Sequence, residues 1–234
     1  MSSLTGEELA SMVTHELRNP LNAMAGWLHL LSNAPGGAAS PVAALATRAT
    51  AGLRRAVDEQ LEQVEMLGRV LRLAGGESDD GAREVDLADL LQTQVDLLRA
   101  APIAEGRAVV LELGENPGGA PRSVVVGNAS ALARAVADIS RYAMRNGVAE
   151  QALHIALSTD TDMPKINISI DAGVDRTMSI WDLFSPPANR LPLPLLHARL
   201  AIEAAGGALM PVSGSDANGD VLQIRFRAPA RGRS

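Results

Sequence analysis

The sequence predicts an α-helical part followed by a mixed α/β part, and a change of pattern along the chain supports this division. Up to about residue 74, apolar residues recur every three or four positions, which is typical of helices that bury one face. Beyond the run Gly75–Gly81, short apolar runs alternate with helical segments, which indicates a sheet covered by helices on one face. With 234 residues, 47% of them hydrophobic, the chain is large enough to bury a core in one or two domains.

Two long helices are expected in the first part. One covers about Thr5–Leu31, and the other begins at Ser40, a good N-cap that precedes Pro41, and ends near Ala74. Proline and glycine between them predict a turn, so the helices form an antiparallel hairpin. A single hairpin of this length leaves an apolar stripe uncovered, and we therefore expect a homodimer with a four-helix bundle.

We assign residues 1–75 to this hairpin, 76–84 to a linker and 85–234 to the α/β domain. The helices expected in the α/β domain are Asp86–Arg99, with Asp86 as cap, Ala129–Arg145 and Leu195–Ala205. The strands expected there are Val109–Leu113, Ser123–Val126, His154–Ser158, Lys165–Ile170, Leu209–Ser213 and Val221–Arg227.

Composition excludes several classes of function. The net charge of -6 argues against a nucleic acid or an anionic membrane bound through a general electrostatic field. The absence of cysteine excludes disulfides and thiol chemistry, and the four histidines are too scattered for an evident metal motif. An uncharged stretch between Arg18 and Arg48 is interrupted by turn residues, so no membrane span is expected, and without a signal peptide the expected location is the cytoplasm.

The segment THELRNPL, residues 14–21, combines groups suited to phosphoryl transfer. The neutral imidazole of His15 has a lone pair that can attack phosphorus. Arg18 and Asn19 follow three and four residues later on the same helical face, and Glu16 can accept a hydrogen bond from the imidazole. An isolated histidine among charged neighbours is usually a plain surface residue, but this combination favours chemistry. The other histidines, His29, His154 and His197, have no evident set of partners in the sequence.

The residues from Thr14 to Leu31 resemble the phosphoacceptor box of two-component sensor histidine kinases. The resemblance implies that His15 is phosphorylated, that Glu16 assists proton transfer, and that Asn19 can help to place water for dephosphorylation of a response regulator. The second helix and the linker agree with the layout of that family's dimerisation and phosphotransfer domain.

The α/β part resembles the ATP-binding domain of the same family, with departures at its nucleotide-binding motifs. Asp138 and Tyr142 stand where the family's N-box has two asparagines that face nucleotide and magnesium. Tyr142 lacks the amide oxygen expected to bind Mg²⁺. Asp171 and Gly173 retain part of the next box, so an adenine contact could survive there, but Asp175 replaces its second glycine with a bulky anion.

The third departure is at Pro192 and Pro194. The register set by Glu203 to Gly207, a helix ending in paired glycines, places both prolines at the glycines of the family's phosphate-binding box. Proline has no N–H to donate to phosphate. Trp181 to Phe184 resembles the family's phenylalanine box, which we interpret as core packing.

These observations favour an ATP-independent histidine phosphotransfer protein that passes phosphoryl groups between receiver-domain aspartates through His15. We expect no cofactor on this chain and Mg²⁺ on the partner receiver, with the bundle surface below His15 as the docking site. Three alternatives stay open: a response-regulator phosphatase that uses Asn19, a scaffold that binds receivers without chemistry, and, least favoured, an active sensor kinase.

Overall fold

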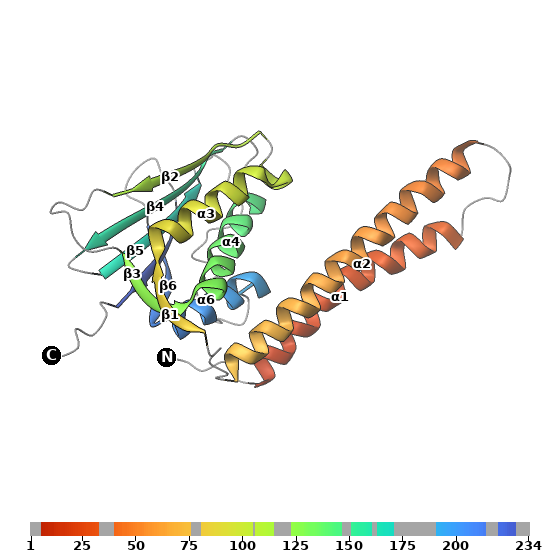
Figure 1. Ribbon diagram of the computed structural model, residues 1–234. Helices are drawn as coiled ribbons and strands as arrows, with labels where there is room; N and C mark the ends of the chain where they lie inside the picture. The colour runs from red at the N-terminus through yellow and green to blue at the C-terminus, as the bar shows by residue number, and fades with distance from the viewer. Residues whose placement is uncertain are drawn as a thin grey trace. The chain divides into compact units, whose positions relative to one another are not determined.

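The computed structural model describes residues 6–32, 40–75, 81–104, 106–114, 123–146, 151–160, 163–170, 191–213 and 220–227 (Figure 1). The chain divides into two compact units, Met1–Leu71 and Arg72–Ser234. The expected order of a helical hairpin followed by an α/β domain is confirmed.

The first unit is a hairpin of two antiparallel helices, α1 (Gly6–Ser32) and α2 (Ser40–Ala74) (Figure 1). Both lie within a residue of their predicted bounds, and α1 continues through Pro20. The shielded side chains form a seam that we define as Leu17, Pro20, Met24, Trp27 and Leu31 of α1 and Ala49, Leu53, Ala56, Gln60, Gln63, Leu67 and Val70 of α2. Among the described residues, no helix is both long and apolar enough to cross a membrane.

The contact between Trp27 and Gly52 sets the register of the two helices. A Cβ atom at Gly52 would lie 2.3 Å from Cε2 of Trp27, so only glycine leaves room for the indole. Because the helices are antiparallel and rise equally per residue, positions equally far from this contact lie at the same level. His15 is twelve residues before Trp27 and Val64 is twelve residues after Gly52, so their backbones are level.

Each helix of the hairpin carries a second apolar stripe beside the seam. This stripe consists of Leu21 and Leu28 on α1 and of Val57, Leu61, Val64 and Leu71 on α2. Their spacing places them along one flank of each helix, and their exposed fractions lie between 44% and 59%. A single hairpin therefore leaves a continuous apolar surface exposed, as the sequence predicts.

The second unit contains the remaining elements. In chain order they are β1 (Ala82–Asp86), α3 (Leu87–Ala100), the short 3-10 helix η1 (Pro102–Ala104), β2 (Val109–Leu113), β3 (Val124–Asn128), α4 (Ala129–Asn146), β4 (Leu153–Asp160), β5 (Met163–Ile170), α6 (Leu193–Ala204), β6 (Gly207–Ser213) and β7 (Asp220–Phe226). Each predicted strand and helix is present. β1 was not predicted, and its first three residues, 82–84, were assigned to the end of the linker.

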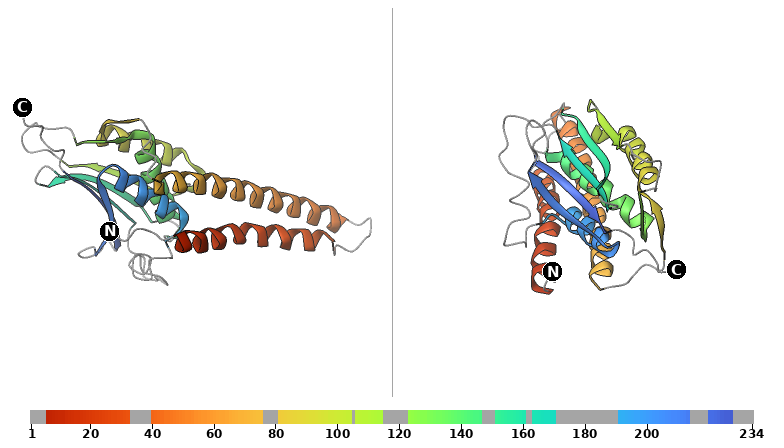
Figure 2. Two further views of the ribbon diagram at one scale, coloured as in Figure 1. Left: turned by 90° about the horizontal axis from the view of Figure 1, so that it is seen from below. Right: turned by 90° about the vertical axis from the view of Figure 1, so that its left-hand side faces the viewer.

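Five strands form one sheet in the order β2-β4-β5-β7-β6, in which β2 and β4 are parallel and the other neighbours antiparallel. β1 and β3 form a separate antiparallel pair. Helices α3, α4 and α6 lie over one face of the large sheet (Figures 1 and 2). Alternate residues of the strands, among them Ile155, Ile168 and Ile224, are buried and form the core between sheet and helices.

Side-chain caps begin two of the helices. Oδ1 of Asp86 accepts a hydrogen bond from the N–H of Ala88 at 3.0 Å, which confirms the predicted cap of α3. Oδ1 of Asn128 accepts one from the N–H of Ala131 at 2.9 Å and so caps the start of α4. These caps fix the points at which the chain turns from strand into helix.

Glycines end α6. Gly206 has φ +73°, a left-handed conformation that favours glycine. A Cβ atom at Gly207 would lie 2.8 Å from Cγ2 of Ile202 and 2.9 Å from Cδ1 of Phe226. The paired glycines that set the register of the sequence comparison therefore stand at the end of the helix, as expected.

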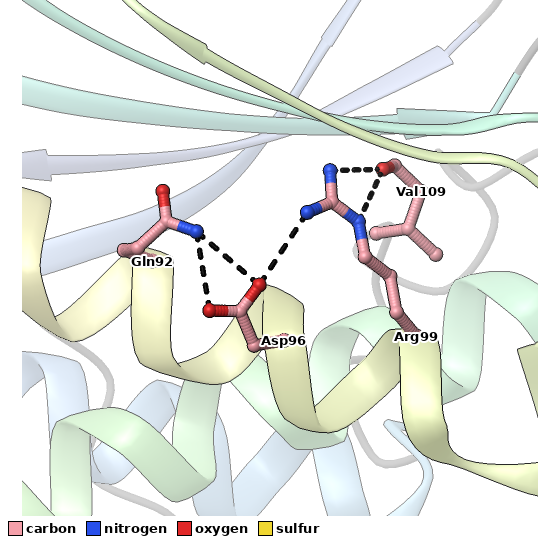
Figure 3. Close-up of polar contacts among 4 residues, drawn as sticks. All are labelled: Gln92, Asp96, Arg99 and Val109. Carbon is pink, nitrogen blue, oxygen red and sulfur yellow. Dashed lines mark hydrogen bonds and ion pairs between the residues drawn. The ribbon is translucent and has the colours of Figure 1, made fainter.

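An arginine on α3 holds the first residue of β2 (Figure 3). Nε and Nη2 of Arg99 both donate to the backbone carbonyl of Val109, at 3.1 and 2.9 Å. Asp96 accepts from Nη1 of Arg99 at 3.4 Å and from Nε2 of Gln92 at 3.2 Å, so the guanidinium is held in place. This network ties the outer strand of the sheet to the helix above it.

Candidate functional site

His15 lies in the first half of α1, within the helical segment that the sequence predicts. The side chains of His15, Glu16 and Asn19 are outside the described residues, so their positions follow from the backbone. At about 100° per residue, position 15 lies on the side of α1 opposite the seam. Arg18 is on the outward side of this turn and is exposed, which leaves its guanidinium available near the histidine position.

The inner side of the same turn is packed against α2. Pro20 is buried, and Leu17 is half-buried. At this level α2 contributes Gln60 and Gln63, whose buried Oε1 atoms have no hydrogen-bond partner in the described part of the chain. The turn that carries His15 is therefore braced on its inner side, while Thr14 and Arg18 of the same turn are exposed.

The second unit contains a buried hydrogen bond that joins α4 to α6. Nδ1 of His197 lies 2.9 Å from Oδ2 of Asp138, and the exposed fractions of these residues are 2% and 8%. The other carboxylate oxygen of Asp138 lies 3.8 Å from Nη1 of Arg141. Asp138, the first of the two N-box positions, thus directs its carboxylate to side chains of its own domain.

Tyr142, the second N-box position, is half-buried one helical turn further along α4. Burial raises the pKa of its phenol above the ordinary value of 10.0, so the side chain is a neutral hydroxyl at physiological pH. A neutral phenol is a weak ligand for Mg²⁺, which prefers carboxylate, carbonyl and water oxygens.

Pro192 and Pro194 form the start of α6. Pro192 is the N-cap, makes no side-chain capping bond, and accepts the N–H of Leu196 at its carbonyl at 3.0 Å. Pro194 is the second residue of the helix and has no N–H. The sequence interpretation began this helix at Leu195, whereas the structure begins it at Leu193, because proline is tolerated in the first turn.

The flanking leucines Leu191, Leu193 and Leu195 are buried, so this end of α6 is packed and apolar. Asp171, Gly173 and Asp175, which resemble the family's second nucleotide box, and Trp181 to Phe184 lie outside the described residues. Among the described side chains, no group of three histidine, aspartate or glutamate residues is arranged to bind a metal ion.

The helical hairpin matches a known family. Residues 7–74 match the model of the His Kinase A (phospho-acceptor) domain, which covers α1, the turn and α2. The chain carries a His Kinase A (phospho-acceptor) domain as its helical hairpin. Its hairpin is therefore a phospho-acceptor domain, as the resemblance of residues 14–31 implied. None of the curated protein sequences matches the chain significantly.

Solved structures of histidine kinases share the fold of this chain. The Acinetobacter baumannii histidine kinase AdeS aligns over 92% of this chain and 98% of its own, with 15% identity and a TM-score of 0.65. Histidine kinase ThkA in complex with response regulator protein TrrA aligns over 99% and 64%, with 15% identity and a TM-score of 0.65. Full-length ShkA in complex with AMPPNP aligns over 95% and 46%, with 18% identity and a TM-score of 0.60. At these identities, the likeness concerns the fold.

Sequence reasoning missed the role of His197. We expected no partner set for it, and this expectation was wrong, because the residue pairs with Asp138 from another helix. A signal was present: each residue is a lone ionisable group on the apolar side of its helix, and buried ionisable groups are usually paired.

Proposed function

We propose that this protein is a histidine phosphotransfer protein that relays phosphoryl groups between receiver-domain aspartates through His15, without using ATP. The observation that carries the proposal is the contrast between its two units. The hairpin matches a phospho-acceptor domain, while the Asp138 carboxylate in the other unit is bound to His197.

The residues at the nucleotide position do not fit a magnesium–nucleotide complex. Asp138 would have to break its contact with His197 to bind a metal, which would leave the imidazole buried without a partner. Pro194 removes one of the backbone donors that a helix N-terminus offers to phosphate, and buried leucines surround it. The change at Asp138 and Tyr142 and the change at the start of α6 lie on different elements, and both disfavour ATP.

The proposed step is a balanced transfer. A ring nitrogen of His15 attacks the phosphorus of a receiver's aspartyl phosphate, an N–P bond forms, and the bond between phosphorus and the aspartate oxygen breaks. The carboxylate leaves with the bonding pair, and the proton of the other ring nitrogen is held by the adjacent Glu16. Because phosphohistidine and aspartyl phosphate are both energy-rich, the transfer can run in either direction.

The proposed partners are receiver domains of response regulators or hybrid kinases, with Mg²⁺ held by the receiver, and a second copy of this chain. The match with ThkA in its complex with a response regulator is in keeping with such partners. The exposed stripe of Leu21, Leu28, Val57 and Leu61 suits a second hairpin, which would bury it in a four-helix bundle. By helical geometry this stripe and position 15 lie on different sides of α1, so pairing would leave His15 accessible.

Labelled phosphate separates this proposal from its alternatives. The full chain is incubated either with labelled ATP and Mg²⁺ or with labelled, phosphorylated receiver domains, and acid-labile label on the chain is measured. We expect label from a receiver and none from ATP, and loss of label in His15→Ala. His29→Ala is the matched control, since it removes another histidine of the same helix and should transfer normally.

Labelling from ATP alone would overturn the proposal in favour of a sensor kinase. Release of inorganic phosphate from the receiver that persists in His15→Ala and stops in Asn19→Ala would indicate a phosphatase. Binding of a receiver with neither transfer nor phosphate release would indicate a scaffold.

A further inference from the structure

The outward side of α4 carries a ridge of three arginines, Arg134, Arg141 and Arg145. At about 100° per residue they lie within a narrow sector of the helix, and they span eleven residues, or about 16 Å. Arg134 and Arg145 are exposed, and the side chain of Arg141 is 51% exposed. We call these three residues the arginine ridge.

Few acidic side chains compensate the positive charge of the arginine ridge. The one acidic residue of α4 is Asp138, which is buried and lies 2.9 Å from His197, with Arg141 further away at 3.8 Å. In the described part of the chain, Arg134 and Arg145 make no ion pair, whereas Arg69, Arg99 and Arg199 each have an acidic partner within 4 Å. Three like charges on one ridge therefore repel one another with little compensation.

A further guanidinium lies at the end of the same helix. Nη1 of Arg107 donates to the carbonyl of Met144 at 2.5 Å, which places another positive charge near Arg145. The chain as a whole carries a net charge of -6, so this local concentration of positive charge runs against the average charge of the protein. Such a ridge attracts an anionic partner and repels a cationic one.

We propose that Arg134, Arg141 and Arg145 form a docking surface for the carboxylate-rich face of the receiver domain that exchanges phosphoryl groups with His15. This inference rests on the proposed function. A receiver that binds its own Mg²⁺ must present several carboxylates beside its phosphorylated aspartate. Guanidinium groups form strong, geometrically specific pairs with carboxylates, so arginine suits such a face.

The contacts that the arginine ridge can make are electrostatic and lie at the exposed surface of α4. Their main contributions are expected in association rate and partner choice.

The test uses the full chain and a receiver domain that exchanges phosphate with it in the labelling assay, with beryllofluoride bound to the receiver as a stable mimic of its phosphoryl group. We expect Arg134→Glu/Arg145→Glu to raise the Kd by about tenfold or more and to reduce the dependence of binding on salt. The matched control is Arg83→Glu/Arg227→Glu, which changes the charge equally at two exposed arginines elsewhere and should leave the Kd within about twofold. A milder pair, Arg134→Gln/Arg145→Gln, should show a smaller loss in the same direction.

Failure of this inference and failure of the proposed function give different results. Suppose that receivers exchange phosphate with the wild type, and that the ridge variant and the control variant bind the receiver with equal Kd. The docking surface is then refuted and the relay stands. If no receiver exchanges phosphate, the proposed function fails and this inference with it. Binding of ATP or duplex DNA that is lost in Arg134→Glu/Arg145→Glu, with receiver binding unchanged, would assign the ridge to another anion and also refute the inference.

Discussion

Replacement of His197 by alanine should destabilise the second unit far more than the loss of an exposed ion pair would. Asp138 is 8% exposed in the intact protein, and the change removes its 2.9 Å partner and leaves Arg141 at 3.8 Å. Removing one member of a buried pair costs about 3–5 kcal/mol, and since Arg141 offers partial compensation we expect about 3 kcal/mol. For a unit of this size, that corresponds to a fall in Tm of about 6–12 °C.

A double-mutant cycle measures the part of this cost that belongs to the pair. Unfolding of the wild type, Asp138→Ala, His197→Ala and the double variant is followed by circular dichroism in denaturant, and the free energies of unfolding are compared. The losses in free energy of unfolding of the two single variants, added together, should exceed the loss in the double variant by about 1–3 kcal/mol. The reason is that the second substitution removes a group that the first left unpaired. Replacing both residues with leucine should recover most of the stability, since apolar pairs of similar volume often substitute well for buried ion pairs.

Arg199 provides the control for this prediction. It also makes a 2.9 Å contact on α6, with Glu203, but both side chains are partly exposed. Arg199→Ala should cost at most about 0.5 kcal/mol. If His197→Ala costs no more than Arg199→Ala, or if the two substitutions in the cycle are additive, the view that this pair holds α4 and α6 together is refuted.

Three further predictions concern single positions. Gly52→Ala should destabilise the hairpin and shift the fluorescence of Trp27, because the new Cβ would lie 2.3 Å from the indole, whereas Gly26→Ala, with nothing within 4 Å, should be neutral or stabilising; equal effects would refute the register. Burial raises the pKa of Tyr142, so the contribution of its neutral phenol to stability should be present below pH 10.0 and lost as the pH rises through the folded-state pKa. Tyr142→Phe should flatten the denaturation profile in that range, and titration of the phenolate absorbance at an ordinary pKa would contradict this; Tyr142 is the one tyrosine of the chain. Arg99→Gln should lower the free energy of unfolding by about 1–3 kcal/mol in denaturant, because a charged donor pair to a backbone carbonyl is lost, and an unchanged midpoint would refute that role.

Local patterns in the sequence predicted most of the fold because the elements concerned carry their own signals. Asp86 precedes a helical apolar pattern and caps α3, and the short apolar run VVLEL predicted the observed bounds of β2, Val109–Leu113. β1 was missed because its sequence AREVD is mostly charged, and its strand conformation depends on pairing with β3. Such pairing joins residues about forty positions apart, which a local pattern does not contain.

One part of the candidate site could also be predicted from a local motif, and another part could not. The phosphoacceptor segment around His15 is a contiguous motif, and the family match to residues 7–74 agrees with its interpretation as part of a phospho-acceptor hairpin. The contact between Asp138 and His197 joins residues 59 positions apart, so it depends on how α4 and α6 pack against each other. The sequence indicated that the nucleotide position had changed at Asp138, but the partner that occupies its carboxylate became evident from the packing.

The hydrogen bonds from Arg99 to the carbonyl of Val109 on β2 also protect the chain against aggregation. β2 is an outer strand, and its ladder with β4, in which Ala108 accepts from Leu153 and Gly114 donates to Leu157, turns the carbonyl of Val109 away from the sheet. An outer strand with open backbone groups is a template on which another chain can add a strand and start aggregation. By covering the first of these carbonyls with a charged group, Arg99 makes strand addition at this end of β2 unfavourable.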